Sequence, residues 1–148
     1  MELLTKEEIQ SSKFYFLSEN TNFIKLHPRI PRRRMKYENE TTKRICCVKR
    51  IYSALQALPL STGMELCVYQ IIPTNRTKFA RPELTDVLDS SHTHELWCLN
   101  SVAVKKVGII KILGRETLWK RVKSPWDSNR NVLFDTNKNV TYVWKEKY

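Results

Sequence analysis

The feature that most constrains the fold is a run of aliphatic residues in the C-terminal third of the chain. Seven aliphatic residues lie between positions 102 and 113, with two basic interruptions. Because β-branched side chains pack well on the pleated surface of a sheet, the run predicts one long strand, bent at Gly108. The seven residues are Val102, Val104, Val107, Ile109, Ile110, Ile112 and Leu113.

Other segments also predict strands. Residues 64–72, Met-Glu-Leu-Cys-Val-Tyr-Gln-Ile-Ile, are rich in apolar residues and are bounded by a glycine and a proline. Residues 132–134 and 140–144 predict a hairpin, because the intervening Asp-Thr-Asn-Lys-Asn contains residues that tolerate turn conformations. The chain therefore predicts a fold that is mainly β.

Three segments predict helices. Residues 5–18 begin with a capping box, Thr5 and Glu8, and continue with apolar residues that can share one face. Residues 45–57 do not alternate cleanly, fit a helical stripe better, and are followed by a proline that would stop the helix. Residues 82–90 predict a short acidic helix. The expected class is thus α+β, mainly β.

Positive charge is concentrated between residues 25 and 50. This stretch contains ten Lys or Arg and two acidic residues, a net charge of +8 within the chain's formal +11. Pro28 and Pro31 disfavour helix here, so residues 20–44 predict an extended basic arm. A block of like charge repels itself, and phosphate is its usual compensating partner. A second basic segment, residues 105–130, has eight Lys or Arg against two acidic residues.

Size and composition bound the organisation. At 148 residues the chain predicts one domain. We expect an N-terminal helix and basic arm at residues 1–44 and a single β-rich domain at residues 45–148. No apolar stretch approaches the roughly 20 residues that span a bilayer. The N-terminus lacks the basic and apolar regions of a secretory signal, so no membrane partner is expected.

The cysteines predict structural thiols. Without a secretory signal, the four cysteines are expected to be reduced and mostly buried. Adjacent Cys46 and Cys47 would point to opposite faces of a strand and do not pair easily with each other. Their basic neighbours would lower a thiol pKa if the thiols were exposed. No histidine lies nearby to act as a base, so we favour structural thiols over a nucleophile.

A metal site and a catalytic site are both weakly indicated. His92, His94 and Cys98 form the one metal-like cluster, but a fourth ligand is not apparent, and we favour surface or partner-facing histidines. The chain has no glycine-rich phosphate loop and no serine nucleophile elbow. We therefore expect no metal, no cofactor and no enzymatic activity.

The C-terminal third resembles the start of an OB-fold. Residues 99–114, Leu-Asn-Ser-Val-Ala-Val-Lys-Lys-Val-Gly-Ile-Ile-Lys-Ile-Leu-Gly, are similar to the first barrel strand in the middle subunits of telomeric CST and of replication protein A. In that family a charged loop, a hairpin with an acidic turn and a strand ending in an aromatic residue and Lys follow. Here those features would be Phe134-Asp135, the turn to Asn139, and residues 140–145. The family's turn glycine is absent, and upstream strands or a partner would have to complete the barrel.

The resemblance implies an OB-like or partly open β-barrel with flanking helices and a basic N-terminal arm. It also implies binding of single-stranded DNA or of a second OB subunit, often at chromosome ends, through a basic groove with stacking aromatics. The groove candidates it implies are Lys105, Lys111, Arg115, Lys120, Arg121, Lys123 and Arg130. The stacking candidates are Trp119, Trp126 and Tyr142, of which Trp126 is the best placed for an exposed contact.

The basic arm adds its own candidates for phosphate contacts. These are Arg29, Arg32, Arg33, Arg34, Lys36, Lys43 and Arg44. The run from Arg32 to Arg34 with Lys36 also fits a nuclear address.

Two functions are compatible with these features. The first is a non-enzymatic nuclear subunit of a chromosome-end or genome-maintenance complex, which binds nucleic acid and favours single-stranded DNA, with a protein partner subunit. The alternative is a protein–protein adaptor that docks on an acidic partner and binds no nucleic acid itself. An open sheet edge would favour the alternative, because it invites a partner strand.

Overall fold

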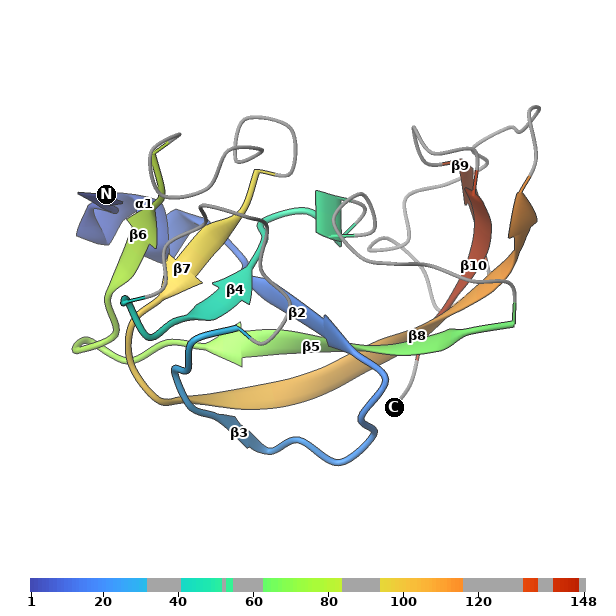
Figure 1. Ribbon diagram of the computed structural model, residues 1–148, viewed down its shortest axis with the longest axis horizontal. Coiled ribbons are helices and arrows are strands. Elements are labelled where there is room, and N and C mark those ends of the chain that lie inside the picture. Colours follow the sequence, from blue (N-terminus) through green and yellow to red (C-terminus); the bar gives the residue numbers. More distant parts are fainter. Residues whose placement is uncertain are drawn as a thin grey trace.

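The computed structural model describes residues 1–31, 41–51, 53–54, 63–83, 94–115, 132–135 and 140–146 (Figure 1). Within these ranges the chain is mostly β, which confirms the main prediction about its class. The one helix labelled there is α1 (Lys6–Ser11), and residues 51, 53 and 54 are also helical. No helix in these ranges has the length and apolar character needed to cross a membrane.

The strands form two antiparallel sheets. The four-stranded sheet has the order β1-β6-β7-β4, with β1 (Glu2–Leu3), β6 (Phe79–Arg81), β7 (Leu96–Cys98) and β4 (Ile45–Cys47). The six-stranded sheet has the order β2-β5-β8-β10-β9, and β3 also pairs with β8. Its strands are β2 (Tyr15–Ser18), β3 (Lys25–Leu26), β5 (Glu65–Ile72), β8 (Val102–Arg115), β9 (Val132–Asp135) and β10 (Val140–Glu146).

The long strand β8 organises the larger sheet. One of its edges pairs with β5, and the other edge pairs first with β3 and then with β10. The register with β5 shifts between Val68, opposite Gly108, and Tyr69, opposite Lys106. Figure 1 shows β5 and β8 curling together beneath the four-stranded sheet at one end. At the other end β8 pairs with β10 of the β9–β10 hairpin. The larger sheet is thus a curled half-barrel.

The main core fills the space between the two sheets. Phe14, Ile71 and Val102 from the larger sheet's side meet Ile45 and Phe79 from the smaller sheet. A second cluster lies on the opposite face of β5, where Leu66 and Val68 pack with Ile51 and Ile110. Both faces of β5 are therefore buried, as expected for a strand with a nearly continuous apolar sequence.

The N-terminal helix is shorter than predicted. Thr5 caps α1, since its Oγ1 accepts a hydrogen bond from the backbone N–H of Glu8 at 3.1 Å, as the capping box predicts. The helix ends at Ser11, and the predicted continuation to residue 18 is wrong. Phe14 instead stacks on Phe79, with ring centroids 4.0 Å apart, and β2 follows. Burial of this aromatic pair outweighs local helix preference.

Two more expectations about the first half of the chain are corrected. Residues 45–47 form β4 rather than a helix, because Ile45 and Cys47 both enter the core between the sheets. The described part of residues 20–44 is not a free arm, since β3 pairs with β8 and Arg29 pairs with Arg44. The larger sheet includes β2 and β3, which lie within residues 1–44.

Of the remaining expectations, some are confirmed, and others concern residues outside the described part of the chain. The strand over residues 64–72 and the long strand from residue 102 are confirmed by β5 and β8. The hairpin is confirmed by pairing of β9 with β10, and β10 is the strand that pairs with β8. The predicted acidic helix lies mostly outside the described residues, as do the turn at residues 136–139 and the side chains of the hairpin.

A charge cluster closes the end of the smaller sheet nearest α1. Glu8 accepts a 2.9 Å hydrogen bond from Nη2 of Arg81 and lies 3.6 Å from Nζ of Lys49, and Arg81 also lies 3.7 Å from Glu2. The Arg81 hydrogen bond lowers the pKa of the Glu8 carboxyl below its ordinary value of 4.5. All four side chains remain accessible to solvent, so salt screens these pairs.

The Glu8 cluster predicts a small, pH-dependent contribution to stability. A lowered carboxyl pKa stabilises the fold at neutral pH, and this contribution is lost as pH falls through the folded-state pKa. Glu8→Gln should therefore lower the midpoint of urea unfolding slightly at pH 7 and leave it unchanged in acid below that pKa. Glu7→Gln, an exposed neighbour on the same helix, is the control. An equal effect of Glu8→Gln at both pH values would contradict this assignment.

Candidate functional site

The candidate site is a pocket along one edge of β4, between two places where other segments of the chain are hydrogen-bonded to that edge. The other edge of β4 pairs with β7. On the edge that faces away from β7, backbone hydrogen bonds join Arg44 to Arg29 at 2.9 and 3.1 Å, and Val48 to Tyr15 at 2.8 and 3.0 Å. Cys46 lies between these two bridges, so the pocket opens where β4 has no strand alongside it.

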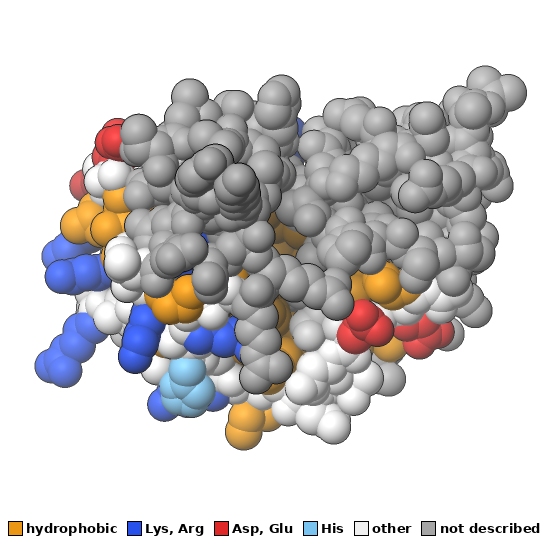
Figure 2. All heavy atoms as spheres, in the orientation of Figure 1, with side chains coloured by type: hydrophobic (Ala, Val, Ile, Leu, Met, Phe, Trp, Pro, Cys, Tyr) orange, Lys and Arg blue, Asp and Glu red, His pale blue; other side chains and the backbone are white. Residues whose placement is uncertain are grey.

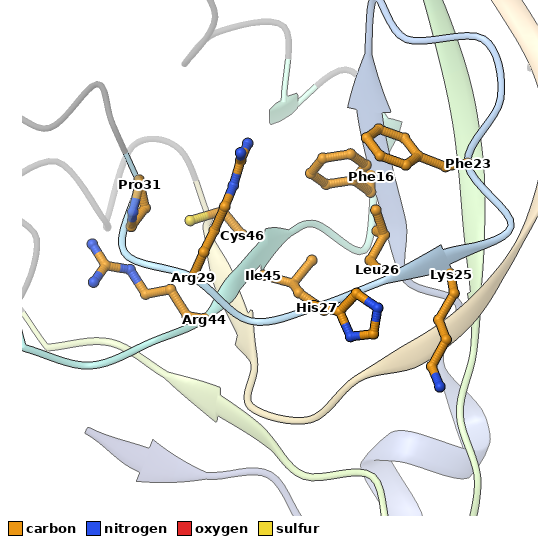
Figure 3. A pocket seen from close by; sticks show the side chains of 10 residues that line it. All are labelled: Phe16, Phe23, Lys25, Leu26, His27, Arg29, Pro31, Arg44, Ile45 and Cys46. Atoms are coloured by element: carbon orange, nitrogen blue, oxygen red, sulfur yellow. The ribbon is translucent and has the colours of Figure 1, made fainter.

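The pocket has a volume of about 580 Å³ and an aromatic end and a cationic end. Figure 3 shows Phe16 and Phe23 at one end and Arg29 and Arg44 at the other, with His27 along the rim between them. Among the residues that the structure describes, none that lines the pocket is acidic. The lining residues are Phe16, Phe23, Lys25, Leu26, His27, Arg29, Pro31, Arg44, Ile45 and Cys46.

The aromatic end is held by packing against Tyr69. Phe23 contacts both Phe16 and Tyr69 edge-to-face, with ring centroids 5.9 and 5.6 Å apart. The Tyr69 hydroxyl donates to the carbonyl of Asn20 and accepts from the backbone N–H of Phe23. Burial raises the pKa of Tyr69 above 10.0, so the hydroxyl stays protonated and able to donate at neutral pH. Phe16 and Phe23 are both half-buried, which leaves part of each ring accessible.

Three basic side chains around the pocket are accessible to solvent. Lys25, His27 and Arg29 are exposed, and within the described residues none of them forms an ion pair. His27 is held by a 2.7 Å hydrogen bond between its Nδ1 and the Ser101 hydroxyl. Arg81, in contrast, is paired with Glu8. The charges of Lys25 and Arg29 are therefore accessible to a ligand at the pocket, whereas the charge of Arg81, near α1, is compensated by Glu8.

Basic side chains also gather on the outer face beside the pocket. In Figure 2 most of the visible Lys and Arg side chains gather at the left and lower left, and the acidic side chains form one group at the upper left and another at the lower right. On the larger sheet, Lys25 of β3 and Ile72 of β5 lie opposite Ala103 of β8 from its two sides, and Lys105 lies opposite Gln70. Lys25, Ile72, Ala103 and Lys105 are exposed. This outer face is cationic with exposed aliphatic residues among the charges.

Arg44 is the clearest correction among the predicted phosphate contacts. Its side chain is 1% exposed, and its guanidinium lies 4.3 Å from the centroid of the Trp97 ring. Its Nη1 donates a 2.9 Å hydrogen bond to the carbonyl of Thr42. A cation stacked and buried in this way supports the wall of the pocket, and it does not present a charge to a polyanion in solution.

The pocket wall continues into a polar cluster on the smaller sheet. Trp97 is fully buried, and its indole N–H donates to a carboxylate oxygen of Glu95 at 3.1 Å. Burial, and then the neighbouring Glu95 carboxylate, raise the pKa of the Cys46 thiol far above its ordinary value. Cys46 is therefore protonated at physiological pH. The neighbouring Arg44 lowers the pKa of this thiol, but burial and Glu95 outweigh it, which agrees with a structural thiol.

The other cysteines also match the expected burial. Cys47, Cys67 and Cys98 are buried, and Cys46 and Cys47 point to opposite faces of β4, as predicted. Burial raises the pKa of Cys47 and of Cys98. Within the described residues, no group of three metal-binding side chains comes together. His92 lies outside those residues, while Cys98 packs in the core between the sheets.

The predicted contact residues have different outcomes. Arg29 lines the pocket, Lys43 is exposed and precedes the pocket residue Arg44 in sequence, and Lys105 is exposed on the outer face. Lys111 and Arg115 lie in β8, but their side chains are outside the described part of the structure, as is that of Tyr142 in β10. The residues that lie wholly outside it are Arg32, Arg33, Arg34, Lys36, Trp119, Lys120, Arg121, Lys123, Trp126 and Arg130.

The sequence-based search missed the aromatic half of the pocket. Phe16 was included in a predicted helix, and Phe23 in a polar arm, so neither was considered a contact residue. Lys25 and His27 were also missed. The available signal was the alternation of apolar Ile24 and Leu26 with polar Lys25 and His27, which is the pattern of a short strand.

Comparison of the chain with models of protein families, with curated proteins and with solved structures found no match. A functional proposal therefore rests on the residues of this chain and on their arrangement.

Proposed function

We propose that this chain is a non-enzymatic protein that binds nucleic acid and favours single strands. The observation that carries the proposal is the pocket, in which accessible Phe16 and Phe23 rings lie opposite exposed Arg29 and none of the described lining residues is acidic. Unstacked bases bind aromatic faces, and the phosphate backbone binds nearby cations. Bases in a duplex are already stacked and paired, so such a pocket favours single strands.

The charge around the pocket supports the same proposal. Lys25 and Lys105 extend the cationic surface onto the outer face of the larger sheet, so a strand leaving the pocket would meet further positive charge. The basic run at residues 32–36 follows Pro31, which itself lines the pocket. Counterion release along such a surface supplies affinity that does not depend on base sequence.

The resemblance of residues 99–114 extends the proposal to an OB-like barrel in a nuclear chromosome-end or genome-maintenance complex with a partner subunit. The curled larger sheet, in which β8 pairs with β5, β3 and β10, is compatible with a barrel-like architecture. The run from Arg32 to Arg34 with Lys36 fits a nuclear address as well as phosphate contacts.

Fluorescence anisotropy with single-stranded and duplex DNA of equal length, titrated across salt, tests the proposal. We expect tighter binding of the single strand and a steep decline of affinity with salt. Lys25→Ala combined with Arg29→Ala should weaken single-strand binding about tenfold or more. The same variant should reduce the log–log salt slope by roughly 1.4, since each phosphate contact contributes about 0.7 on a single strand.

Lys6→Ala combined with Lys13→Ala is the matched control, because it removes two exposed lysine charges from sequence outside the pocket lining. Equal loss of affinity in both double variants would mean that net charge, and not the pocket, determines binding. Absence of binding to either DNA at low salt would overturn the proposal.

One observation favours the alternative of an adaptor that docks on an acidic partner. The outer face of the larger sheet combines Lys25 and Lys105 with Ile72, whose side chain is 43% exposed, and Ile24 nearby is 82% exposed. Exposed aliphatic residues among cations suit a protein partner with apolar and acidic groups. A chain that binds no DNA but captures an acidic partner through this face would support that function instead.

A further inference from the structure

The two ends of the pocket differ in the chemistry they recognise. At one end the half-buried rings of Phe16 and Phe23 form an apolar wall, and Leu26 and Ile45 also line the pocket. At the other end the exposed guanidinium of Arg29 lies near the rim, beside Pro31 (Figure 3). A ligand that fills the pocket must therefore be flat and apolar at one end and anionic at the other.

We propose that the pocket holds one nucleotide unit, with its base against Phe16 and Phe23 and its phosphate at Arg29. This inference rests on the proposed function and makes it more specific. A single base and its own phosphate satisfy both ends of the pocket, while a run of stacked bases would lie along a surface. The nucleotide is inserted sideways from the strand, and the rest of the strand lies on the basic surface outside.

The boundaries of the pocket limit its occupant to one unit. The backbone bridge between Tyr15 and Val48 closes β4 at one side, and the bridge between Arg29 and Arg44 closes it at the other. A nucleic-acid strand cannot run along this edge of β4 past either pair of hydrogen bonds, so we expect it to place a single nucleotide beside Cys46, between them. The volume of about 580 Å³ falls within the roughly 300–1,000 Å³ typical of small-molecule sites.

The lining predicts weak discrimination among bases. Most side chains around the aromatic end are apolar, and the polar groups at the rim are His27 and cations that do not match one base edge. Every base presents a face on which an aromatic ring can pack, so stacking tolerates all four. Recognition of the phosphate is expected to be stronger, because Arg29 supplies several donors in a planar fork.

The phosphate contact can be removed without breaking the wall that carries it. Arg29 pairs with Arg44 through its backbone N–H and carbonyl, at 3.1 and 2.9 Å, and its side chain is exposed. Arg29→Ala therefore leaves the backbone bridge available. Arg29→Lys keeps a positive charge but loses the fork, so it separates charge from geometry.

The experiment is an NMR titration of the full chain with thymidine monophosphate, thymidine and inorganic phosphate as separate probes. We expect the monophosphate to bind more tightly than either thymidine or phosphate, with signals of Phe16, Phe23 and Arg29 shifting together. Arg29→Ala should weaken monophosphate binding about tenfold, as expected for loss of one charge-assisted contact, and leave thymidine binding unchanged. The affinity of Arg29→Lys for the monophosphate should lie between that of the unaltered chain and that of Arg29→Ala.

Phe16→Leu tests the other end of the pocket. It keeps an apolar side chain but removes the ring, so it should weaken the monophosphate and thymidine by the same factor, about fivefold or more. Lys13→Ala, an exposed lysine outside the pocket lining, is the control and should change neither. The amide spectrum of each variant shows whether its fold is retained.

The outcomes separate this inference from the proposed function. If an oligonucleotide binds but the monophosphate neither binds nor competes with it, the one-nucleotide site is overturned and the proposed function remains. If inorganic phosphate binds as tightly as the monophosphate, the base plays no role and the inference is also overturned. If neither oligonucleotide nor monophosphate binds, both fail. If the monophosphate binds and the oligonucleotide does not, the site is supported and polymer binding is overturned.

Discussion

Ile110→Asp is expected to prevent folding of the chain. Ile110 lies near the middle of β8 with no exposed side-chain surface, opposite Leu66 and in the cluster with Leu17 and Val68. A carboxylate placed there loses its hydration with no cation in the described cluster, and it must either stay charged at a cost of several kcal/mol or take up a proton. Domains of this size have a free energy of unfolding of only about 5–15 kcal/mol. The buried carboxylate and the lost apolar contacts together are expected to remove most of that free energy.

The measurement is circular dichroism through a thermal melt, where Ile110→Asp should show no cooperative transition. Ile24→Asp is the matched control. It makes the same chemical change at a residue that is 82% exposed, and its effect on stability should stay within about 0.5 kcal/mol. A cooperative melt of Ile110→Asp close to that of the unaltered chain would mean that β8 is not buried at this position.

Trp97→Ala is expected to cost about 3–5 kcal/mol of stability, the usual range for truncating a buried tryptophan. Trp97 is fully buried on the smaller sheet, where it packs with Ala80, carries the guanidinium of Arg44 at 4.3 Å and donates to Glu95 at 3.1 Å. Removing the indole therefore removes the platform of a buried cation as well as apolar contacts. Urea unfolding followed by circular dichroism measures the loss.

Trp97→Phe separates the contributions of the ring and the N–H. It keeps an aromatic face under Arg44 but leaves the Glu95 contact unmade, so its loss of stability should be smaller than that of Trp97→Ala. A double-mutant cycle with Arg44→Met should give a coupling energy of about 1–2 kcal/mol, as expected for a desolvated cation–π pair. A coupling energy near zero would show that Arg44 and Trp97 act independently.

The parts of the fold that depend on local pattern could be predicted from the sequence. The aliphatic run beginning at Val102 and the apolar segment at residues 64–72 both form strands with bounds close to those expected. The capping contact of Thr5 was also correct, because it joins residues three apart. In each case the deciding interactions lie within the segment or follow from its composition.

The errors occur where a distant residue decides the local structure. Phe14 leaves the predicted helix to stack on Phe79, and Ile45 and Cys47 enter a strand because both can be buried between the sheets. Their alternation with the half-buried Cys46 was a signal for a strand, but the stripe over the following residues outweighed it. Helix preference is a weak guide when a whole face can be buried instead.

The candidate site was even less accessible to sequence reasoning. The basic stretch pointed to Arg29, but charge alone could not distinguish it from Arg44, which is buried on Trp97. The aromatic end exists because the segment around Phe23 packs on Tyr69 of β5 and because β3 joins β8. These pairings join residues far apart in the chain, and no local pattern encodes which strands will meet.

The central position of β8 has a consequence for synthesis of the chain. The ribosome makes residues 1–101 first, and until Val102 and the residues after it emerge, β3 has no strand to pair with and β5 has only β2. A nascent chain of this length therefore presents open strand edges and the apolar faces of β5 to its surroundings. Completion of the sheet requires contacts of high sequence separation, which form slowly.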